Sequence, residues 1–169
     1  MSSTKRAVIV LVSFQAQSSF QAVPLGASCV ASALKSYPAI ASGASVELAD
    51  FSLEEKPFAG QTPERAGEAA AEILSSFEAV PGASRIIIGF SVYVWNRPVA
   101  ESCARALKKK LPGCVTFAGG PEVSSSPASW TAASGIDYLV PGEGERSVVD
   151  LAVSILSASG TRSSAKASS

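Results

Sequence analysis

The chain has 169 residues, of which 47% are hydrophobic and 17% charged, and its formal net charge is zero. This length and composition indicate one globular domain with a full core. The longest basic run is only Lys108–Lys110, so the charge distribution gives no support to nucleic-acid binding. No apolar run approaches the length of a membrane span, and we expect no membrane association.

The residue types that are missing exclude several kinds of chemistry. The sequence has no histidine, which removes Ser-His-Asp and Cys-His catalysis, imidazole bases and histidine metal ligands. Its three cysteines, Cys29, Cys103 and Cys114, are odd in number and lack C-x-x-C spacing. They indicate neither a disulfide framework nor a zinc site, and a reducing cytoplasm is the expected compartment.

Five segments have the pattern of β-strands. Continuous apolar runs predict that the first, third and fourth are central and buried on both faces. The second alternates and predicts a more exposed strand near an edge. The first follows two basic residues like a secretion signal, but it is short and lacks a clean cleavage site, so we interpret it as a strand. The segments are residues 7–13, 45–50, 85–91, 114–118 and 137–140.

Helix signals separate these strands. Pro24 introduces a helix that runs to about Lys35, and Thr62-Pro63-Glu64 is a capped helix start. Asn96 is predicted to cap a helix that ends near Leu111.

The remaining segments are less regular. We expect loops at 14–23 and 51–61, and a loop or short helix at 124–133. Glu145 is predicted to cap the last helix. Residues 1–157 form the predicted domain, and the Ser- and Ala-rich residues 158–169 a disordered tail.

Five successive strand–helix units predict an α/β fold. The expected architecture is a Rossmann- or flavodoxin-like doubly wound parallel sheet in the order 2-1-3-4-5, with helices on both faces. In such sheets ligands bind at the carboxyl ends of the strands. Gly119-Gly120 follows the fourth strand and predicts a ligand-facing floor without side chains. A bulky residue at Gly120 is therefore expected to abolish binding while leaving the fold intact.

Common nucleotide motifs are absent from the first loop. It has neither G-x-G-x-x-G nor G-x-x-x-x-G-K-[ST], which disfavours a dinucleotide fold and a phosphate loop. A receiver domain would carry acids where this chain has Ser13-Phe14-Gln15 and Ser91-Val92. Residues 15–21 include serines but no glycine, so flavin binding is a weak alternative.

Four stretches together resemble the N-terminal cobalamin-binding domain of B12-dependent radical S-adenosylmethionine enzymes. Each lies at the carboxyl end of a predicted strand or at a helix start, in the expected order, and the resemblance covers the chain to about Ser157. The stretches are Pro24-Leu25-Gly26, Gly89-Phe90-Ser91-Val92-Tyr93-Val94-Trp95-Asn96, Ala118-Gly119-Gly120-Pro121-Glu122-Val123 and Gly142-Glu143-Gly144-Glu145.

The resemblance implies a set of cobalamin contacts. One group would line the nucleotide-tail pocket or the corrin face, and a second would lie along the tail. Glu122 would face the corrin amides, and Glu143 is a further candidate. The first group is Ser91, Val92 and Tyr93; the second is Gly119, Gly120 and Pro121.

Two departures from the wider families shape this interpretation. The D-x-H-x-x-G motif of cobalamin methyltransferases and mutases is absent between Ser13 and Gly26. This implies either a base-off cofactor without a protein imidazole or a loss of cobalamin binding. The C-x-x-x-C-x-x-C iron–sulfur motif is also absent. The resemblance therefore implies a cofactor-binding part that is not catalytic alone. The iron–sulfur cluster, S-adenosylmethionine and methyl transfer would belong to a partner radical domain.

One alternative comes from a different functional class. The chain could be a degenerate Rossmann-like domain that binds a protein partner and no cofactor. A pocket filled by Phe14, Phe20 or Trp95 would favour it.

Overall fold

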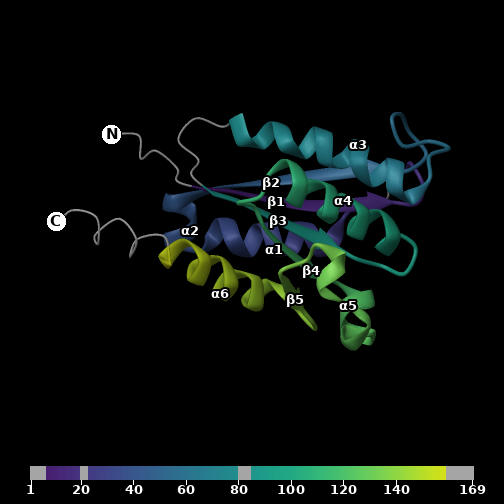
Figure 1. Cartoon of the computed structure of the whole chain (residues 1–169). Helices are drawn as coiled ribbons and strands as arrows, with labels where there is room; N and C mark the ends of the chain where they lie inside the picture. The colour runs from purple at the N-terminus through teal and green to yellow at the C-terminus, as the bar shows by residue number, and fades with distance from the viewer. Residues whose placement is uncertain (1–6, 20–22, 80–84, 159–169) are drawn as a thin grey trace.

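A computed structural model describes residues 7–19, 23–79 and 85–158 (Figure 1). Its centre is a five-stranded parallel sheet in the order β2-β1-β3-β4-β5. This is the topology that the sequence predicts, with the more exposed β2 at one edge. The strands are β1 (Ala7–Gln15), β2 (Ala44–Ser52), β3 (Arg85–Ser91), β4 (Val115–Gly119) and β5 (Tyr138–Val140).

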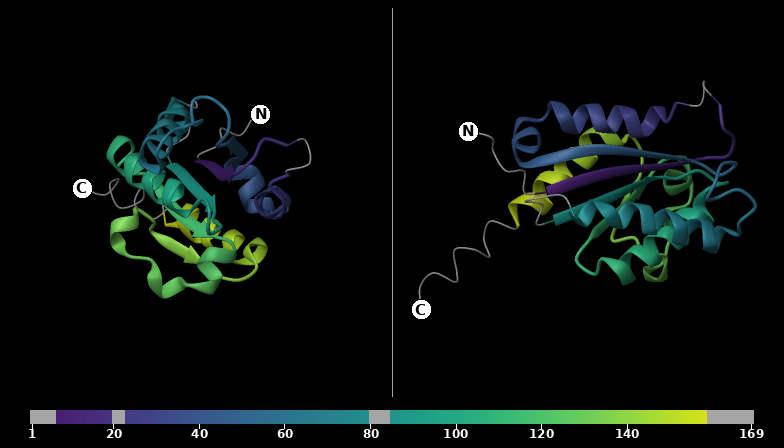
Figure 2. Two further views of the ribbon diagram at one scale, coloured as in Figure 1. Left: turned by 90° about the vertical axis from the view of Figure 1, so that its right-hand side faces the viewer. Right: turned by 90° about the horizontal axis from the view of Figure 1, so that it is seen from above.

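Helices cover both faces of the sheet, as Figures 1 and 2 show. One face carries α1 (Leu25–Ser36), α2 (Pro38–Gly43) and α6 (Gly144–Ser157). The other carries α3 (Pro63–Ser75) and α4 (Arg97–Lys110). A short helix, η1 (Ser76–Ala79), follows α3. Three more short helices overlap residues 124–133, for which the sequence predicted a loop or a short helix. They are α5 (Pro121–Ser125), η2 (Pro127–Ser129) and η3 (Ala132–Ser134).

Strand alternation divides the core into two layers. Ile9 and Leu11 of β1 pack under α1, α2 and α6, whereas Val8 and Val10 pack under α3 and α4. Successive side chains of a strand point to opposite faces. A strand with helices on both sides must therefore be apolar throughout, which explains the continuous hydrophobic run of β1.

β1 and β2 extend beyond their predicted ends, which corrects the loops expected from residues 14 and 51. Phe14 pairs in register with Phe51, and their ring centroids are 5.6 Å apart. Phe51 lies 5.2 Å from the ring of Phe58. Burial of this aromatic cluster favours continued strand pairing over a polar loop.

The structure changes two of the predicted helix caps. Asn96 precedes α4, but its side chain makes no capping hydrogen bond. Its Oδ1 accepts from the Tyr93 N–H at 2.9 Å, and its Nδ2 donates to the carbonyls of Phe14 and Ser91 at 3.1 and 3.2 Å. These bonds tie together the ends of β1 and β3. Glu143, not Glu145, occupies the cap position of α6.

Other predictions concern the start of α3, membranes and the tail. Thr62 Oγ1 accepts the Arg65 N–H, as a cap should. Among the described residues, none of the helices has the length and apolarity to cross a membrane. The tail predicted to be disordered is residues 158–169. All of it except Ala158 lies outside the described residues.

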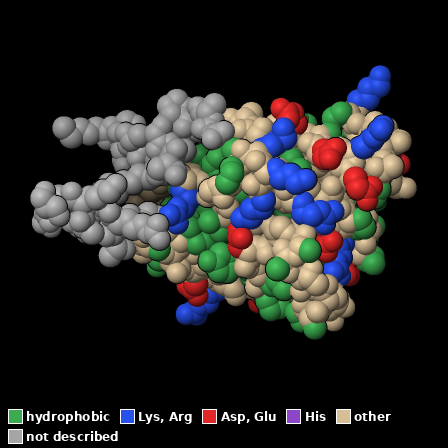
Figure 3. Space-filling model, viewed as in Figure 1, with side chains coloured by type: hydrophobic (Ala, Val, Ile, Leu, Met, Phe, Trp, Pro, Cys, Tyr) green, Lys and Arg blue, Asp and Glu red, His purple; other side chains and the backbone are tan. Residues whose placement is uncertain are grey.

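The face toward the viewer in Figure 3 has an interspersed pattern of charge. Among the ion pairs of α3 and α4, Lys110 of α4 pairs with Glu72 of α3, and Arg105 lies 3.8 Å from Glu101 within α4. Such exposed pairs contribute at most about 1 kcal/mol each. A cavity also lies under the opposite face of the sheet.

Candidate cofactor cavity at the carboxyl edge of the sheet

A cavity of about 240 Å³ opens at the carboxyl edge of the sheet, on the face that α1 and α6 cover. The first turns of α1 and α6 form two of its walls, and the ends of β3, β4 and β5 form the floor. Its apolar lining is supplied by Leu11, Val30, Phe117, Val140 and Val148. The carboxyl edge is where parallel α/β sheets bind ligands.

Glycines in β3 and β4 leave parts of the cavity floor without side chains. Gly89 of β3 pairs in register with Phe117 of β4. A Cβ atom at Gly89 would lie 2.1 Å from the Phe117 ring, so only glycine allows this ring to rest against β3. Gly119, two residues after Phe117, lies on the same face, where an added Cβ would lie 3.3 Å from the Val140 carbonyl oxygen.

Gly120 has a different role from Gly119. Its φ is +107° and its ψ −179°, a backbone region that is essentially restricted to glycine. An added Cβ would lie 2.7 Å from the Val92 carbonyl oxygen. A substitution here would strain the backbone, so the expectation that the fold tolerates a bulky residue at Gly120 is replaced by one of destabilisation.

The helical walls also contain glycines. Gly26 lies in the first turn of α1, and the nearest atom to an added Cβ would be Ser91 Oγ, at 3.9 Å across the cavity. Gly144 begins α6, where an added Cβ would lie 3.1 Å from Val30. Gly26 therefore faces open space, whereas Gly144 allows the two helices to approach.

The cavity brings together six of the eight predicted contact residues. Val92 does not line it, because its side chain is fully buried on the α3/α4 face. Glu122 does not line it either, because its carboxylate pairs with Arg97 at 2.9 Å. The six that line it are Ser91, Tyr93, Gly119, Gly120, Pro121 and Glu143.

Several lining residues were not among the predicted contacts. Gly26, Ala27 and Val30 come from α1, and Glu145 and Val148 from α6. A glycine in the first turn of a helix was the available signal for the α1 wall, as Gly89 inside an apolar strand was for the floor. The apolar members cannot be distinguished from ordinary core residues by sequence.

Aromatic side chains form part of the rim without filling the cavity. The ring of Tyr93 stacks on Trp95, with centroids 4.5 Å apart and planes 14° apart. Trp95 stays 51% exposed. Phe14 packs on the opposite face, and Phe20 lies outside the described residues. Neither Phe14 nor Trp95 therefore fills the cavity, an arrangement that would have favoured the cofactor-free alternative.

The metal-ligating and thiol side chains of the described residues are not gathered at the cavity. Within the described ranges, no group of three or more His, Cys, Asp or Glu side chains could hold a metal ion. Cys103 and Cys114 lie in the opposite core layer, and burial raises the pKa of both thiols. A thiol with a raised pKa is a poor nucleophile at neutral pH.

Comparisons with known proteins agree with this geometry. The family model described as a B12 binding domain matches residues 14–152. A 2-(S-pantetheinyl)-carbapenam-3-carboxylate methyltransferase of Streptantibioticus cattleyicolor is 37% identical over 68 residues. That match covers 40% of this chain and 10% of the relative, so the chain spans only a small part of the relative's length.

Proposed function

The chain belongs to the family of B12-binding domains, and from this premise we propose that it binds cobalamin in the base-off state, with the nucleotide tail of the cofactor in the α1/α6 cavity. The observation that carries this proposal is the glycine-floored cavity at the carboxyl edge. A benzimidazole base is flat and largely apolar. It needs a slot with apolar walls and few polar groups, which Phe117, Val140 and Ser91 supply.

The absence of histidine determines what can ligate cobalt once the base has left it. A chain without any imidazole offers cobalt no histidine ligand. A base held between α1 and α6 is also withdrawn from cobalt. The protein would then bind the cofactor through its tail, while the stacked pair of half-buried Tyr93 and exposed Trp95 lies at the rim, beside the tail.

We further propose that the domain serves a radical S-adenosylmethionine methyltransferase. When bound, cobalamin supplies the methyl-carrying cobalt chemistry. The residues of this chain hold and orient it and leave one corrin face to a catalytic domain with the iron–sulfur cluster and S-adenosylmethionine. The methyltransferase relative and the resemblance of the four motifs favour this role, with the cytoplasm as its compartment.

Gly26 allows a direct test of the cavity. Gly26→Leu places a side chain in the cavity without a backbone clash, so the fold should persist while cobalamin affinity falls by at least about tenfold, or 1.4 kcal/mol. Titration with hydroxocobalamin, followed by visible absorption, measures the affinity, and circular dichroism measures the fold.

Gly43→Leu is the matched control, because an added Cβ at Gly43 meets no atom within 4 Å and this residue ends α2, away from the cavity. Its affinity should equal that of the wild type. Equal binding by wild type and Gly26→Leu would refute the assignment of the tail to this cavity.

A further inference from the structure

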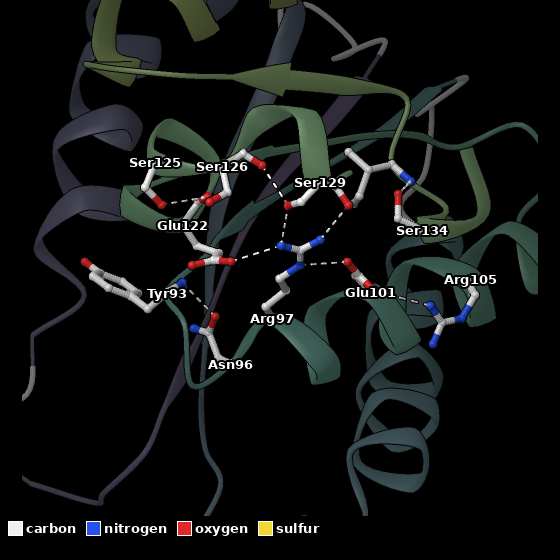
Figure 4. A network of polar contacts seen from close by, with 11 residues as sticks. Tyr93, Asn96, Arg97, Glu101, Arg105, Glu122, Ser125, Ser126, Ser129 and Ser134 are labelled. Atoms are coloured by element: carbon white, nitrogen blue, oxygen red, sulfur yellow. Dashed lines mark hydrogen bonds and ion pairs between the residues drawn. The ribbon is translucent and has the colours of Figure 1, made fainter. Parts of the chain in front are cut away.

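Arg97 joins three elements beside the cavity, as Figure 4 shows. Its Nε donates to Glu101 Oε1 at 2.9 Å within α4, and its Nη1 donates to Glu122 Oε1 of α5 at 2.9 Å. It also donates to Oγ and to the carbonyl oxygen of Ser129, at 2.7 and 2.9 Å. Its guanidinium lies 4.4 Å from the centre of the Trp130 ring.

The position of Arg97 is unfavourable for α4 itself. It is the first residue of this helix, where the helix dipole disfavours a positive charge. Its side chain is only 21% exposed, so it also loses hydration. These costs are offset by Glu101 within α4 and by Glu122 and Ser129 outside it. Arg97 therefore links α4 to α5 and η2.

α5 needs such support. It has five residues and no side-chain cap, and Val123 is its only buried residue. A helix this short is not stable by itself. The planar guanidinium bonds to several acceptors at once, and so it fixes α5 and the following turn against α4.

α5 in turn connects two walls of the cavity. It begins directly after Gly120, and Pro121 lines the cavity. Ser124 Oγ donates to the Gly120 carbonyl at 3.1 Å and accepts the Gly142 N–H at 2.8 Å. Gly142 belongs to the wall that precedes α6. The position of α5 therefore sets both the wall at Pro121 and the wall at Gly142–Gly144.

We propose that Arg97 is a positioning residue for the cavity. Its side chain donates hydrogen bonds to Glu101, Glu122 and Ser129, none of which lines the cavity. It acts on α5 through Glu122 and on η2 through Ser129, and α5 reaches the opposite wall through Ser124. The expected effect of Arg97 on cobalamin affinity rests on the proposed function. Its effect on the position of α5 and of the cavity walls does not depend on any ligand.

The affinity test uses Arg97→Ala. We expect cobalamin to bind about tenfold more weakly, a loss of about 1.4 kcal/mol, because the two walls lose their fixed separation. Arg105→Ala is the matched control, since Arg105 lies on the same helix and also faces Glu101, at 3.8 Å, but has no ion pair with α5. Its affinity should stay at the wild-type value. Arg97→Lys should give an intermediate affinity, because an ammonium group cannot replace the planar fork.

The ligand-free test is the amide exchange rate of Gly142. The Gly142 N–H donates to Ser124 of α5 and has no bond with Arg97. We expect its exchange in Arg97→Ala to be about tenfold faster, because the opening equilibrium rises by that factor. Such an increase would show that the loss of Arg97 displaces α5. Arg105→Ala should leave the rate unchanged. If the wild type binds no cobalamin, the proposed function fails while this rate still decides the role of Arg97.

An unchanged Gly142 exchange rate in folded Arg97→Ala, or an equal effect of Arg105→Ala, would overturn the proposal. If Arg97→Ala does not fold, Glu122→Gln is the second variant, because it removes the negative charge that α5 offers to Arg97. It should also accelerate Gly142 exchange, and failure to do so would again contradict the positioning role.

Discussion

Glycines around the cavity are required for different physical reasons. Gly89 makes room for the Phe117 ring, and Gly26 leaves the cavity open toward Ser91. Gly120 instead has a backbone conformation that other residues adopt only under strain. Substitutions at these positions should therefore affect packing, ligand access and backbone energy, respectively.

Gly120→Ala should lower the free energy of unfolding by about 1–3 kcal/mol, the cost of a residue in such a backbone region. The added methyl would also approach the Val92 carbonyl to 2.7 Å. Urea denaturation of wild type and variant measures this loss. Unchanged stability would mean that the turn relaxes freely, contrary to the close packing of β3 and β4 at this point.

At the scale of elements, the floor of the cavity depends on the short strand β5. Only Tyr138–Val140 form it, yet Val140 lines the cavity. Asp137, just before β5, accepts the Thr116 N–H of β4 at 2.7 Å and a hydrogen bond from Lys108 of α4 at 2.5 Å. This carboxylate attaches the edge strand to β4 and to α4.

The stability of this attachment should depend on pH. Burial acts to raise the pKa of Asp137, but hydrogen bonds from Lys108 and Thr116 outweigh it and lower the pKa below the ordinary value of 3.8. Because the folded pKa is the lower one, the carboxylate stabilises the fold above pH 3.8, and this stabilisation is lost as pH falls through the folded pKa.

Asp137→Asn should therefore be less stable than the wild type at pH 7, and the difference should shrink as the pH falls below about 4. Thermal unfolding of both proteins across this range measures it. A constant difference between the two proteins at every pH would contradict an ionised Asp137 as the cause.

The sequence predicts the sheet order because each strand has its own pattern of burial. The apolar runs of β1, β3 and β4 leave only β2 and β5 for the edges. It does not predict that Phe14 and Phe51 continue their strands, because that choice depends on an aromatic cluster with the distant Phe58. Glu122 likewise reads as a free carboxylate until the fold brings Arg97 to it.

At the scale of the whole molecule, the two faces of the sheet differ in structure. The α3/α4 face has a buried hydrophobic core and carries ion pairs on its exterior. The α1/α6 face leaves a cavity at the carboxyl edge. At this edge the buried Asn96 joins the ends of β1 and β3 by hydrogen bonds to the carbonyls of Phe14 and Ser91.

The electron paramagnetic resonance spectrum of cob(II)alamin tests the central claim most directly. Free cob(II)alamin at neutral pH has its own base on cobalt, and the spectrum shows nitrogen splitting. With excess wild-type protein, the account predicts that this splitting disappears, because the base moves into the α1/α6 cavity and the chain has no imidazole to replace it. Gly26→Leu should retain the spectrum of the free cofactor. Nitrogen splitting that persists in the presence of excess wild-type protein would contradict the account.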